Sequence, residues 1–384
     1  MAQQSHGRLI DAPNRVVIVG GGPAGCATAL SLLAQGFAPQ DILVIEASHF
    51  QQERIGESIP PDTRRLLAEL GGLAEFLNQG HETCHGSASV WGGDEVGYND
   101  FICNPQGAGW HLDRRRFDAW LAGVVAQRGV EVWNGVRCSA ILPSVAGQLR
   151  LRLNGAVDCD TLQARFVVDA TGARARCARH LGARRLELDR MVCVSGLFSL
   201  PHNAEFTQMT LLESVEYGWW YTARLPNNRI ATALATSPAI YRERQLRRHS
   251  IWLKHLARTR YIAPTLQSCA PHAPLSTWSV PSFILDQMWG DNWISVGDAA
   301  SAYDPLSSQG IYKALATGLQ AGRAIRGHLL DNSPEALRTY QTTIEEMFQQ
   351  YARQRAYYYD IEQRFPNAVF WRERRTAKLH HIDT

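Results

Sequence analysis

The segment VVIVGGGPAGCATALSLLAQG, residues 16–36, constrains the fold more than any other feature of this chain. Its first four residues are all apolar, as in a parallel strand buried on both faces. Gly20, Gly22 and Gly25 follow with the spacing G-x-G-x-x-G, and Pro23 suits the first turn of the helix that comes next. We therefore predict a strand, a tight glycine turn and a helix, which together begin a nucleotide-binding α/β unit.

The next predicted strand places an acidic residue where such a unit needs one. Residues 42–47 read ILVIEA, and Glu46 stands 21 positions after Gly25. The glycines allow the backbone to approach a pyrophosphate, and the helix N-terminus stabilises its negative charge. A carboxylate at the end of the second strand accepts hydrogen bonds from ribose hydroxyls. We therefore predict a dinucleotide site here in preference to a purely structural turn.

Residues 296–315, VGDAASAYDPLSSQGIYKAL, place a second carboxylate at a strand end near the other end of the chain. Asp298 ends a short apolar strand, and we expect a helix to begin near Ser308–Gly310. Asp298 can accept from a ribityl hydroxyl, and the free N–H groups of the helix would face the pyrimidine edge of a flavin. Two distant contact sets suit FAD better than NAD, although a loop-capping role is the alternative for Asp298.

The pattern of apolar runs divides the chain into a nucleotide-binding part and a second layer. Residues 187–285 alternate β-like runs with turns, while residues 66–77 and 334–360 have a helical pattern. We predict an α/β fold with a Rossmann-like FAD-binding domain, an inserted, mostly antiparallel β substrate domain, and a C-terminal helical segment with a basic tail. The predicted boundaries are, in that order, residues 1–186 with 286–330, residues 187–285 with part of 80–110, and residues 331–384.

Charge, cysteines and hydropathy exclude several classes of function. The net charge of +3 is too small to argue for nucleic acid, and no apolar run approaches the ~20 residues of a transmembrane helix. The eight cysteines include no C-x-x-C pair, so metal binding has no support, and they suit a reducing compartment. The N-terminal residues contain no apolar signal segment, and we expect a cytoplasmic protein with no membrane or nucleic-acid partner.

Three spaced motifs resemble those of the FAD-dependent aromatic hydroxylases with the p-hydroxybenzoate hydroxylase fold. They are Gly-Gly-Gly-Pro-Ala-Gly at residues 20–25, Asp-Ala-Thr-Gly at 169–172, and Gly297-Asp298 followed by Asp304-Pro305 and Gly310. Further stretches resemble the flavin-dependent halogenase-like branch. They are Gly-Glu-Ser-Ile-Pro-Pro at 56–61, Trp-His-Leu-Asp-Arg at 110–114 with Phe117-Asp118, and Asp-Pro-Leu-Ser-Ser-Gln-Gly at 304–310. The resemblance implies FAD as cofactor, O₂ as a substrate, and a reactive flavin C4a-hydroperoxide.

The resemblance also implies which residues bind the cofactor. Arg114 stands where the family places an arginine, and Arg54 would approach through the loop that carries residues 56–58. Exposed salt bridges are the alternative for both arginines. The predicted FAD-binding residues are Gly20, Gly22, Pro23, Ala24, Gly25, Glu46, Arg54, Ser58, Arg114, Asp298, Pro305, Gly310 and Ile311.

The chain departs from true halogenases in two places. Those enzymes carry a lysine shortly after the first long helix, which handles the hypohalous species, but Thr83–Trp91 contains none. They also carry W-x-W-x-I-P, which the stretch GWWYTARLP at 218–226 does not match. The pattern is more similar to the flavoprotein monooxygenases that accompany quinoprotein amine dehydrogenases and amino-acid oxidases. Those monooxygenases help to build tryptophan-derived quinone cofactors.

We therefore predict hydroxylation of an aromatic ring, most specifically a tryptophan side chain of a protein or peptide precursor. A halogenase with a displaced lysine, a hydroxylase of a small aromatic metabolite, a non-catalytic flavin-binding partner protein and, more weakly, a prenyl-chain reductase are the alternatives. No second G-x-G-x-x-G follows a strand, so electrons would come from transient NAD(P)H or from a separate flavin reductase. The basic, aromatic tail from Arg364 to Lys378 is expected to be a solvated face or, alternatively, a partner-docking surface.

The sequence offers candidates for the substrate pocket but no catalytic dyad or triad. Trp91, Trp219 and Trp220 are candidates for an aromatic wall, with ordinary core packing as the alternative. His111 is a candidate acid or base, with a structural role as the alternative. Ser308, at the expected start of a helix, is a further pocket candidate.

Overall fold

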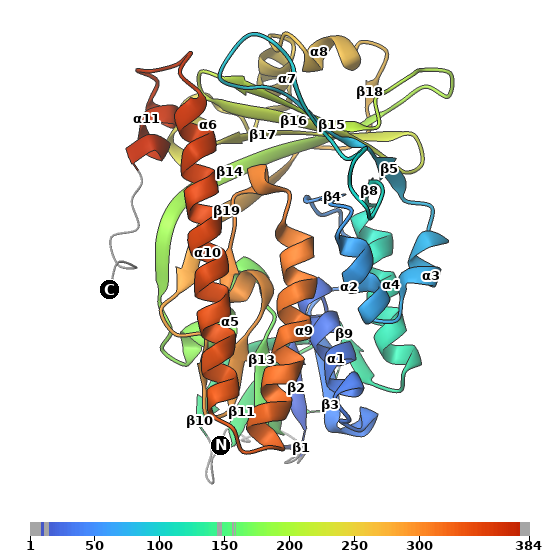
Figure 1. Ribbon diagram of the computed structural model, residues 1–384, viewed down its shortest axis with the longest axis vertical. Helices are drawn as coiled ribbons and strands as arrows, with labels where there is room; N and C mark the ends of the chain where they lie inside the picture. Colours follow the sequence, from blue (N-terminus) through green and yellow to red (C-terminus); the bar gives the residue numbers. More distant parts are fainter. Residues whose placement is uncertain (1–8, 11–14, 144–147, 156, 158, 377–384) are drawn as a thin grey trace, which may run out of the picture.

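The computed structural model describes residues 9–10, 15–143, 148–155, 157 and 159–376. A mostly parallel sheet with its helices forms one end of the molecule, and a larger, mostly antiparallel sheet forms the other (Figure 1). The long helices α9 (Gly310–Leu329) and α10 (Glu335–Ile361) lie side by side and antiparallel, and α10 runs from the first end to the second. This arrangement confirms the predicted α/β class with C-terminal helices. No helix among the described residues is long and apolar enough to cross a membrane.

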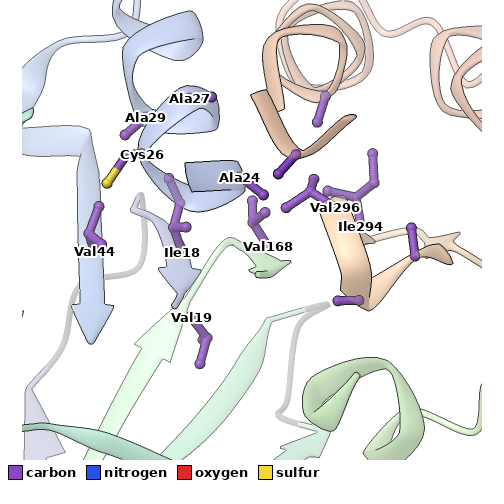
Figure 2. Packing of buried hydrophobic residues seen from close by; sticks show 14 of the residues in the cluster. Ile18, Val19, Ala24, Cys26, Ala27, Ala29, Val44, Val168, Ile294 and Val296 are labelled. Atoms are coloured by element: carbon purple, nitrogen blue, oxygen red, sulfur yellow. The ribbon is translucent and has the colours of Figure 1, made fainter. Parts of the chain in front are cut away.

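A six-stranded sheet forms the buried centre of the nucleotide-binding end. Its order is β20-β21-β13-β2-β3-β9, and all neighbours are parallel except β20 and β21. Helix α1 packs against β2 and β3, and strands of a neighbouring four-stranded sheet complete the same core, so the central strands are buried and uniformly apolar. Figure 2 shows Ile18, Val44 and Val168 packed with Ala24 and Cys26. The bounds are β2 (Val16–Val19), β3 (Ile42–Glu46), β9 (Glu131–Asn134), β13 (Phe166–Asp169), β20 (Trp289–Gly290), β21 (Trp293–Ser295) and α1 (Pro23–Ala34).

Two glycines bring α9 directly against α1. A Cβ at Gly318 would lie 2.6 Å from the carbonyl oxygen of Ala24, and one at Gly322 would lie 2.3 Å from Ser31 Oγ. Ser31 Oγ donates a 2.8 Å hydrogen bond to the carbonyl of Leu319. Later residues of α9 therefore meet later residues of α1, so the two helices run in the same direction and their N-termini point the same way.

A nine-stranded sheet forms the second layer. Its main order is β22-β19-β14-β17-β16-β15-β6-β7, with β18 attached to β14, and β15 with β6 is the parallel pair among antiparallel ones. Residues 86–100 supply two of its strands. The domain boundaries given from the sequence remain predictions. The bounds are β6 (Gly86–Val90), β7 (Gly97–Asp100), β14 (Arg185–Ser199), β15 (Met209–Val215), β16 (Gly218–Leu225), β17 (Arg229–Thr236), β18 (Ala270–Pro271), β19 (Ser276–Leu285), β22 (Ser301–Ala302), α6 (Pro238–Glu243), α7 (His249–Leu256) and α8 (Ile262–Thr265).

The predicted single helix over residues 66–77 is wrong. α2 (Thr63–Glu69) ends before Gly71, which adopts a φ of +69°, and α3 (Leu73–Leu77) begins two residues later. A left-handed residue ends a helix, and glycine adopts that conformation readily. The remaining elements are β1 (Leu9–Ile10), β4 (Ser58–Ile59), β5 (Glu82–Cys84), β8 (Gly109–His111), β10 (Arg137–Pro143), β11 (Leu149–Asn154), β12 (Thr161–Ala164), α4 (Arg114–Gln127) and α5 (Arg176–His180).

The segment after α10 folds back onto the β layer. In α11 (Val369–Thr376), Phe370 and Trp371 are fully buried, and the Arg374 guanidinium lies 3.8 Å from the centre of the Phe370 ring. The expectation of a solvated tail is therefore wrong for this helix, because its aromatic residues complete an apolar cluster beneath the sheet. Lys378, the last residue of the predicted tail, lies outside the described residues.

Candidate functional site

The carboxyl ends of four parallel strands meet at one edge of the six-stranded sheet, and each carries a predicted motif. β2 leads into Gly20, β3 ends at Glu46, β13 ends at Asp169, and β21 is followed by Gly297-Asp298. Ligands of open α/β sheets bind outside these strand ends. The fold thus brings motifs from both ends of the chain to one place, which is the candidate site.

The three glycines of the first turn have different tasks. Gly20 adopts a φ of +118°, and a Cβ there would lie 2.2 Å from the carbonyl oxygen of Ala170. A Cβ at Gly25 would lie 1.9 Å from the carbonyl oxygen of Gly20, whereas one at Gly22 would meet nothing within 4 Å. Gly20 and Gly25 are therefore needed by the fold itself, and Gly22 leaves the turn open to a ligand.

The N-termini of α1 and α9 both lack a capping side chain. Neither Gly22 nor Gln309 caps its helix through a side-chain hydrogen bond, and neither helix has an acidic residue in its first turn. Free N–H groups and the positive end of the helix dipole remain available to an anionic or electron-rich group. At the start of α9, a Cβ on Gly310 would meet nothing within 4 Å, and Ile311 is buried.

Glu46 is held in one orientation at the end of β3. One of its oxygens accepts from the backbone N–H of Gly21 at 2.8 Å, and the other accepts from the N–H and hydroxyl of Ser48 at 2.8 and 2.6 Å. Arg54 Nη2 lies 3.7 Å from the same carboxylate. The oxygen that accepts from Gly21 keeps a lone pair for a further donor, so this geometry permits the predicted contact with ribose hydroxyls.

Asp118 holds the two predicted arginines together, although it was not among the predicted site residues. Its buried carboxylate lies 3.1 Å from Arg54 Nη1 and 3.1 Å from Arg114 Nη2. Arg114 also donates to the carbonyl of Ile55 at 2.7 Å, which ties α4 to the loop before β4. The four-residue spacing of Arg114 and Asp118 on one helix was the available sequence signal.

Asp298 faces solvent on one side and a buried lysine on the other. Its side chain is 43% exposed, and its Oδ1 lies 2.8 Å from Nζ of Lys313, which is 1% exposed. Lys313 also donates to the carbonyl of Ser301 and lies 4.2 Å from the centre of the Tyr303 ring. Burial lowers the pKa of the Lys313 ammonium, and the Asp298 charge opposes that shift. Lys313, which was not predicted as a site residue, thus fixes the position of the Asp298 carboxylate from the buried side.

The Asp304–Ser308 loop connects this pair to the start of α9. Asp304 caps a single turn over Pro305–Ser307 by accepting from the N–H of Leu306 at 2.9 Å. Ser308 follows with a φ of +50° and is exposed. The buried carboxylate of Asp304 also lies 3.3 Å from Nε of Arg355 on α10. The loop therefore presents Pro305 and Ser308 from a backbone that is anchored beneath.

Comparison with known proteins identifies the family. Residues 14–355 match the model of the FAD binding domain family. The chain belongs to this family. Over 95% of its length it is 32% identical to LodB of Marinomonas mediterranea, named as an FAD-dependent oxidoreductase, and the match covers 98% of that protein.

Two solved structures show how far the likeness in fold extends. The flavin-dependent halogenase CmlS superposes with a TM-score of 0.86 and 24% identity, over 95% of this chain and 68% of that one. The peptidyl tryptophan dihydroxylase QhpG, described as essential for tryptophylquinone cofactor biogenesis, superposes with a TM-score of 0.71 and 26% identity. That match covers 94% of this chain and 78% of QhpG.

The protein is therefore a flavin-dependent oxidoreductase that binds FAD, and the residues present fit the cofactor. The open face at Gly22 and the uncapped start of α1 suit the pyrophosphate, with Arg54 and Arg114 close enough to add positive charge. Glu46 suits the ribose and Asp298 the ribityl chain, while the start of α9 suits the polar edge of the flavin. These individual assignments stay predictions.

A chain of hydrogen bonds runs from Glu57 to His111 beneath the sheet. The Tyr221 hydroxyl donates to Glu57 Oε2 at 3.3 Å and lies 3.2 Å from Ser58 Oγ. Ser58 Oγ lies 3.1 Å from Thr210 Oγ1, which lies 2.9 Å from His111 Nε2. Burial raises the pKa of Glu57 and lowers the pKa of His111 to about 4. His111 is therefore neutral near pH 7. Ser58, which was predicted to contact FAD, is part of this series of hydrogen bonds.

The predicted aromatic wall divides between two faces of β16. Trp220 is fully buried and packs against Trp252, with ring centres 5.0 Å apart. Trp219 points to the opposite face, where it packs near Trp91 and donates to the hydroxyl of Tyr359 at 3.1 Å. Core packing accounts for both buried tryptophans, and a pocket role stays a prediction for Trp91, which is partly exposed.

A small cavity of about 50 Å³ separates the arginine cluster from the nine-stranded sheet. Arg54 and Arg114 line one side, and Ser195, Ala231 and Trp278 line the other. Trp278, which was not a predicted pocket residue, donates to Ser195 Oγ at 3.3 Å. Among the described residues, no cluster of His, Cys, Asp or Glu is arranged to hold a metal ion.

Proposed function

We propose that this protein is an FAD-dependent monooxygenase that hydroxylates a tryptophan side chain presented by a peptide or protein. The likeness to QhpG, at 26% identity and over 94% of this chain, supports the substrate class. The 32% identity to the oxidoreductase LodB supports a redox reaction without assigning a substrate. The proposal concerns the type of oxidation and the substrate, since the flavin itself is established by the family.

The observation that carries the proposal is where the lysines lie. The chain has three, Lys254, Lys313 and Lys378. Lys313 is enclosed beneath Asp298, so its amine has no access to a substrate. Lys254 is on α7, and Trp252 of the same helix packs on one face of the nine-stranded sheet. The cavity is lined by the opposite face of that sheet. Among the described residues, no lysine is positioned to handle a hypohalous species, and this favours hydroxylation over halogenation.

The side chains of the protein bind the cofactor, orient the substrate and shield the reacting groups from water. FAD, when bound, supplies the oxygen activation that the protein side chains cannot supply. Arg54, Arg114 and Asp298 fix the cofactor's position, and the sheet above the cavity excludes water from the reacting face. An electron-rich indole needs correct placement more than a strong base. Electrons come from NAD(P)H that binds transiently or from a separate flavin reductase.

The test measures the product. The FAD-loaded protein is reduced and mixed with O₂ and a capped tryptophan peptide, with and without chloride or bromide, and the peptide is analysed by mass spectrometry. We expect oxygen on the tryptophan whether or not halide is present, and none on a matched peptide with phenylalanine in its place. Oxidation of free tryptophan or a small phenol alone would refute the peptide substrate.

A flavin-dependent halogenase is the second candidate. The TM-score of 0.86 to CmlS favours it, although an identity of 24% supports a shared fold rather than a shared reaction. In the same experiment, halide-dependent incorporation of chlorine or bromine without oxygen would support this candidate and exclude the hydroxylase.

A further inference from the structure

A pocket of about 350 Å³ opens beside the Asp304–Ser308 loop, where the start of α9 meets the middle of α10. Tyr303 and Gln309, which line it, stand immediately before and after that loop. Pro60, the last but one residue of the Gly-Glu-Ser-Ile-Pro-Pro stretch, lines the other side. The pocket therefore adjoins the flavin end of the cofactor site but lies outside the cavity near Trp278.

The wall formed by α10 is a single helical stripe. Its lining residues are Met347, Gln350, Tyr351 and Gln354, at the i, i+3, i+4 and i+7 positions that share one face of a helix. Tyr351 stacks on Tyr303, with ring centres 4.0 Å apart and planes at 5°. The stacked pair makes this wall rigid, whereas the two glutamines are exposed beside it.

Four polar groups that line the pocket are uncharged and free to bind a ligand. Within the described residues, the side-chain amides of Gln309, Gln350 and Gln354 have no hydrogen-bond partner, and neither does the hydroxyl of Tyr312. A glutamine amide offers two donors and one acceptor, which match the N–H and C=O groups of a peptide backbone. Asp62 is the one charged residue in the lining, and no arginine, lysine or histidine is present. This composition does not suit a phosphate or carboxylate ligand.

We infer that this pocket and the α10 stripe bind the polypeptide segment that carries the target tryptophan, an inference that rests on the proposed function. The occupant is an extended, uncharged peptide: its backbone pairs with the glutamines, and its side chains contact Tyr312 and Met347. Tyrosines are enriched in protein interfaces because they bury a large area with little loss of rotamer freedom. Tyr358 continues the stripe one turn beyond Gln354 and is 51% exposed, so the surface extends past the pocket towards Trp91.

The test compares the double variant Gln350→Ala/Gln354→Ala with the control Gln349→Ala. Gln349 is on the same helix but does not line the pocket, and alanine favours helix at all three positions. A capped, uncharged, fluorescently labelled tryptophan peptide is titrated with the oxidised, FAD-loaded protein, and its anisotropy is measured. Because two hydrogen bonds are removed, we expect peptide binding roughly tenfold weaker in the double variant and unchanged in the control.

A kinetic measurement separates this inference from the proposed function. In peptide oxidation, the double variant is expected to raise KM with kcat unchanged, and FAD binding is expected to stay as in the unaltered protein. Glutamine-dependent binding of a peptide that never gains oxygen would retain the pocket and refute the hydroxylase. Oxidation with kcat/KM unaffected by the double variant would retain the hydroxylase and overturn the pocket. Failure of the unaltered protein to bind the peptide, or equal loss in Gln349→Ala, would also overturn it.

Discussion

The hydroxyl of Tyr359, near the end of α10, donates a 2.7 Å hydrogen bond to Oδ2 of Asp304, the first residue of the loop that leads to α9. The same hydroxyl accepts from Trp219 of the β layer. About two helical turns earlier on α10, the hydroxyl of Tyr351 accepts a hydrogen bond from the backbone N–H of Asp304 at 2.7 Å. Helix α10 therefore anchors the loop that leads to the start of α9.

Tyr359→Phe is expected to loosen that loop. The ring stays in place, but a buried carboxylate loses a donor, which lowers the free energy of unfolding by ~1–3 kcal/mol. FAD affinity should fall as well, because the loop loses an anchor. Urea unfolding and a flavin fluorescence titration measure the two effects. The control Tyr357→Phe changes an exposed residue of the same helix and should alter neither; an unchanged affinity in Tyr359→Phe would show that the anchor is dispensable.

Two glycine variants are expected to separate folding from cofactor binding. Gly22→Ala adds a methyl group where there is open space, so the protein should fold normally and bind FAD at least tenfold more weakly, by ~1.4 kcal/mol or more. Gly25→Ala should instead destabilise the protein itself, since its Cβ would meet the Gly20 carbonyl. Thermal unfolding of the apoprotein and flavin titration distinguish the two results. Normal FAD affinity in Gly22→Ala would refute the pyrophosphate assignment.

Asp298 and Lys313 allow the cofactor role of a carboxylate to be separated from its role as a counter-ion. Asp298→Ala should reduce FAD affinity by ~1.5–3 kcal/mol and also reduce stability, because a buried ammonium is left unpaired. In Asp298→Ala/Lys313→Met the stability should recover in part while FAD affinity stays low. Denaturant unfolding of the apoprotein and equilibrium flavin binding give both quantities. Recovery of FAD affinity in the double variant would contradict a direct contact with Asp298.

His111 predicts a dependence of stability on pH. Burial depresses its pKa in the folded protein to about 4, against 6.5 for an unperturbed histidine. Between these values the unfolded chain binds the proton and the folded protein does not. The free energy of unfolding therefore falls as pH drops from about 6.5 to about 4, by on the order of 3 kcal/mol for this one residue.

Urea unfolding at a series of pH values tests this expectation. His111→Gln should reduce the slope of the free energy of unfolding against pH below pH ~6.5, whatever its effect on stability near neutrality. The control His85→Gln alters a ring on the surface and should leave the slope as it is. A slope that His111→Gln does not change would assign the pH dependence to other groups. His81, whose pKa burial also lowers to about 4, is the first of these to test.

The local patterns of the chain were sufficient to predict the nucleotide-binding unit. Strand, glycine turn and helix follow one another over residues 16–34, and each is favoured by short-range sterics and by the period of its apolar residues. Glu46 and Asp298 could be recognised in the same way, since Glu46 ends β3 and Asp298 closely follows β21, and both strands lie in the parallel sheet that leads into the glycine turn. These features depend on residues close together in sequence, and they led to FAD.

Long-range packing decided which charged side chains pair and which aromatic side chains are buried. Nothing near Lys313 in sequence indicates that its ammonium is buried against Asp298. The close approach of α9 to α1 at Gly318 and Gly322 is likewise a contact between segments far apart in the chain. Adjacent tryptophans on β16 have different environments because successive strand residues face opposite sides, and only the helices that cover each side determine what they contact. The sequence by itself determined the cofactor. The tertiary structure alone decided which charges are paired and which surface stays open, because those contacts join residues far apart in the chain.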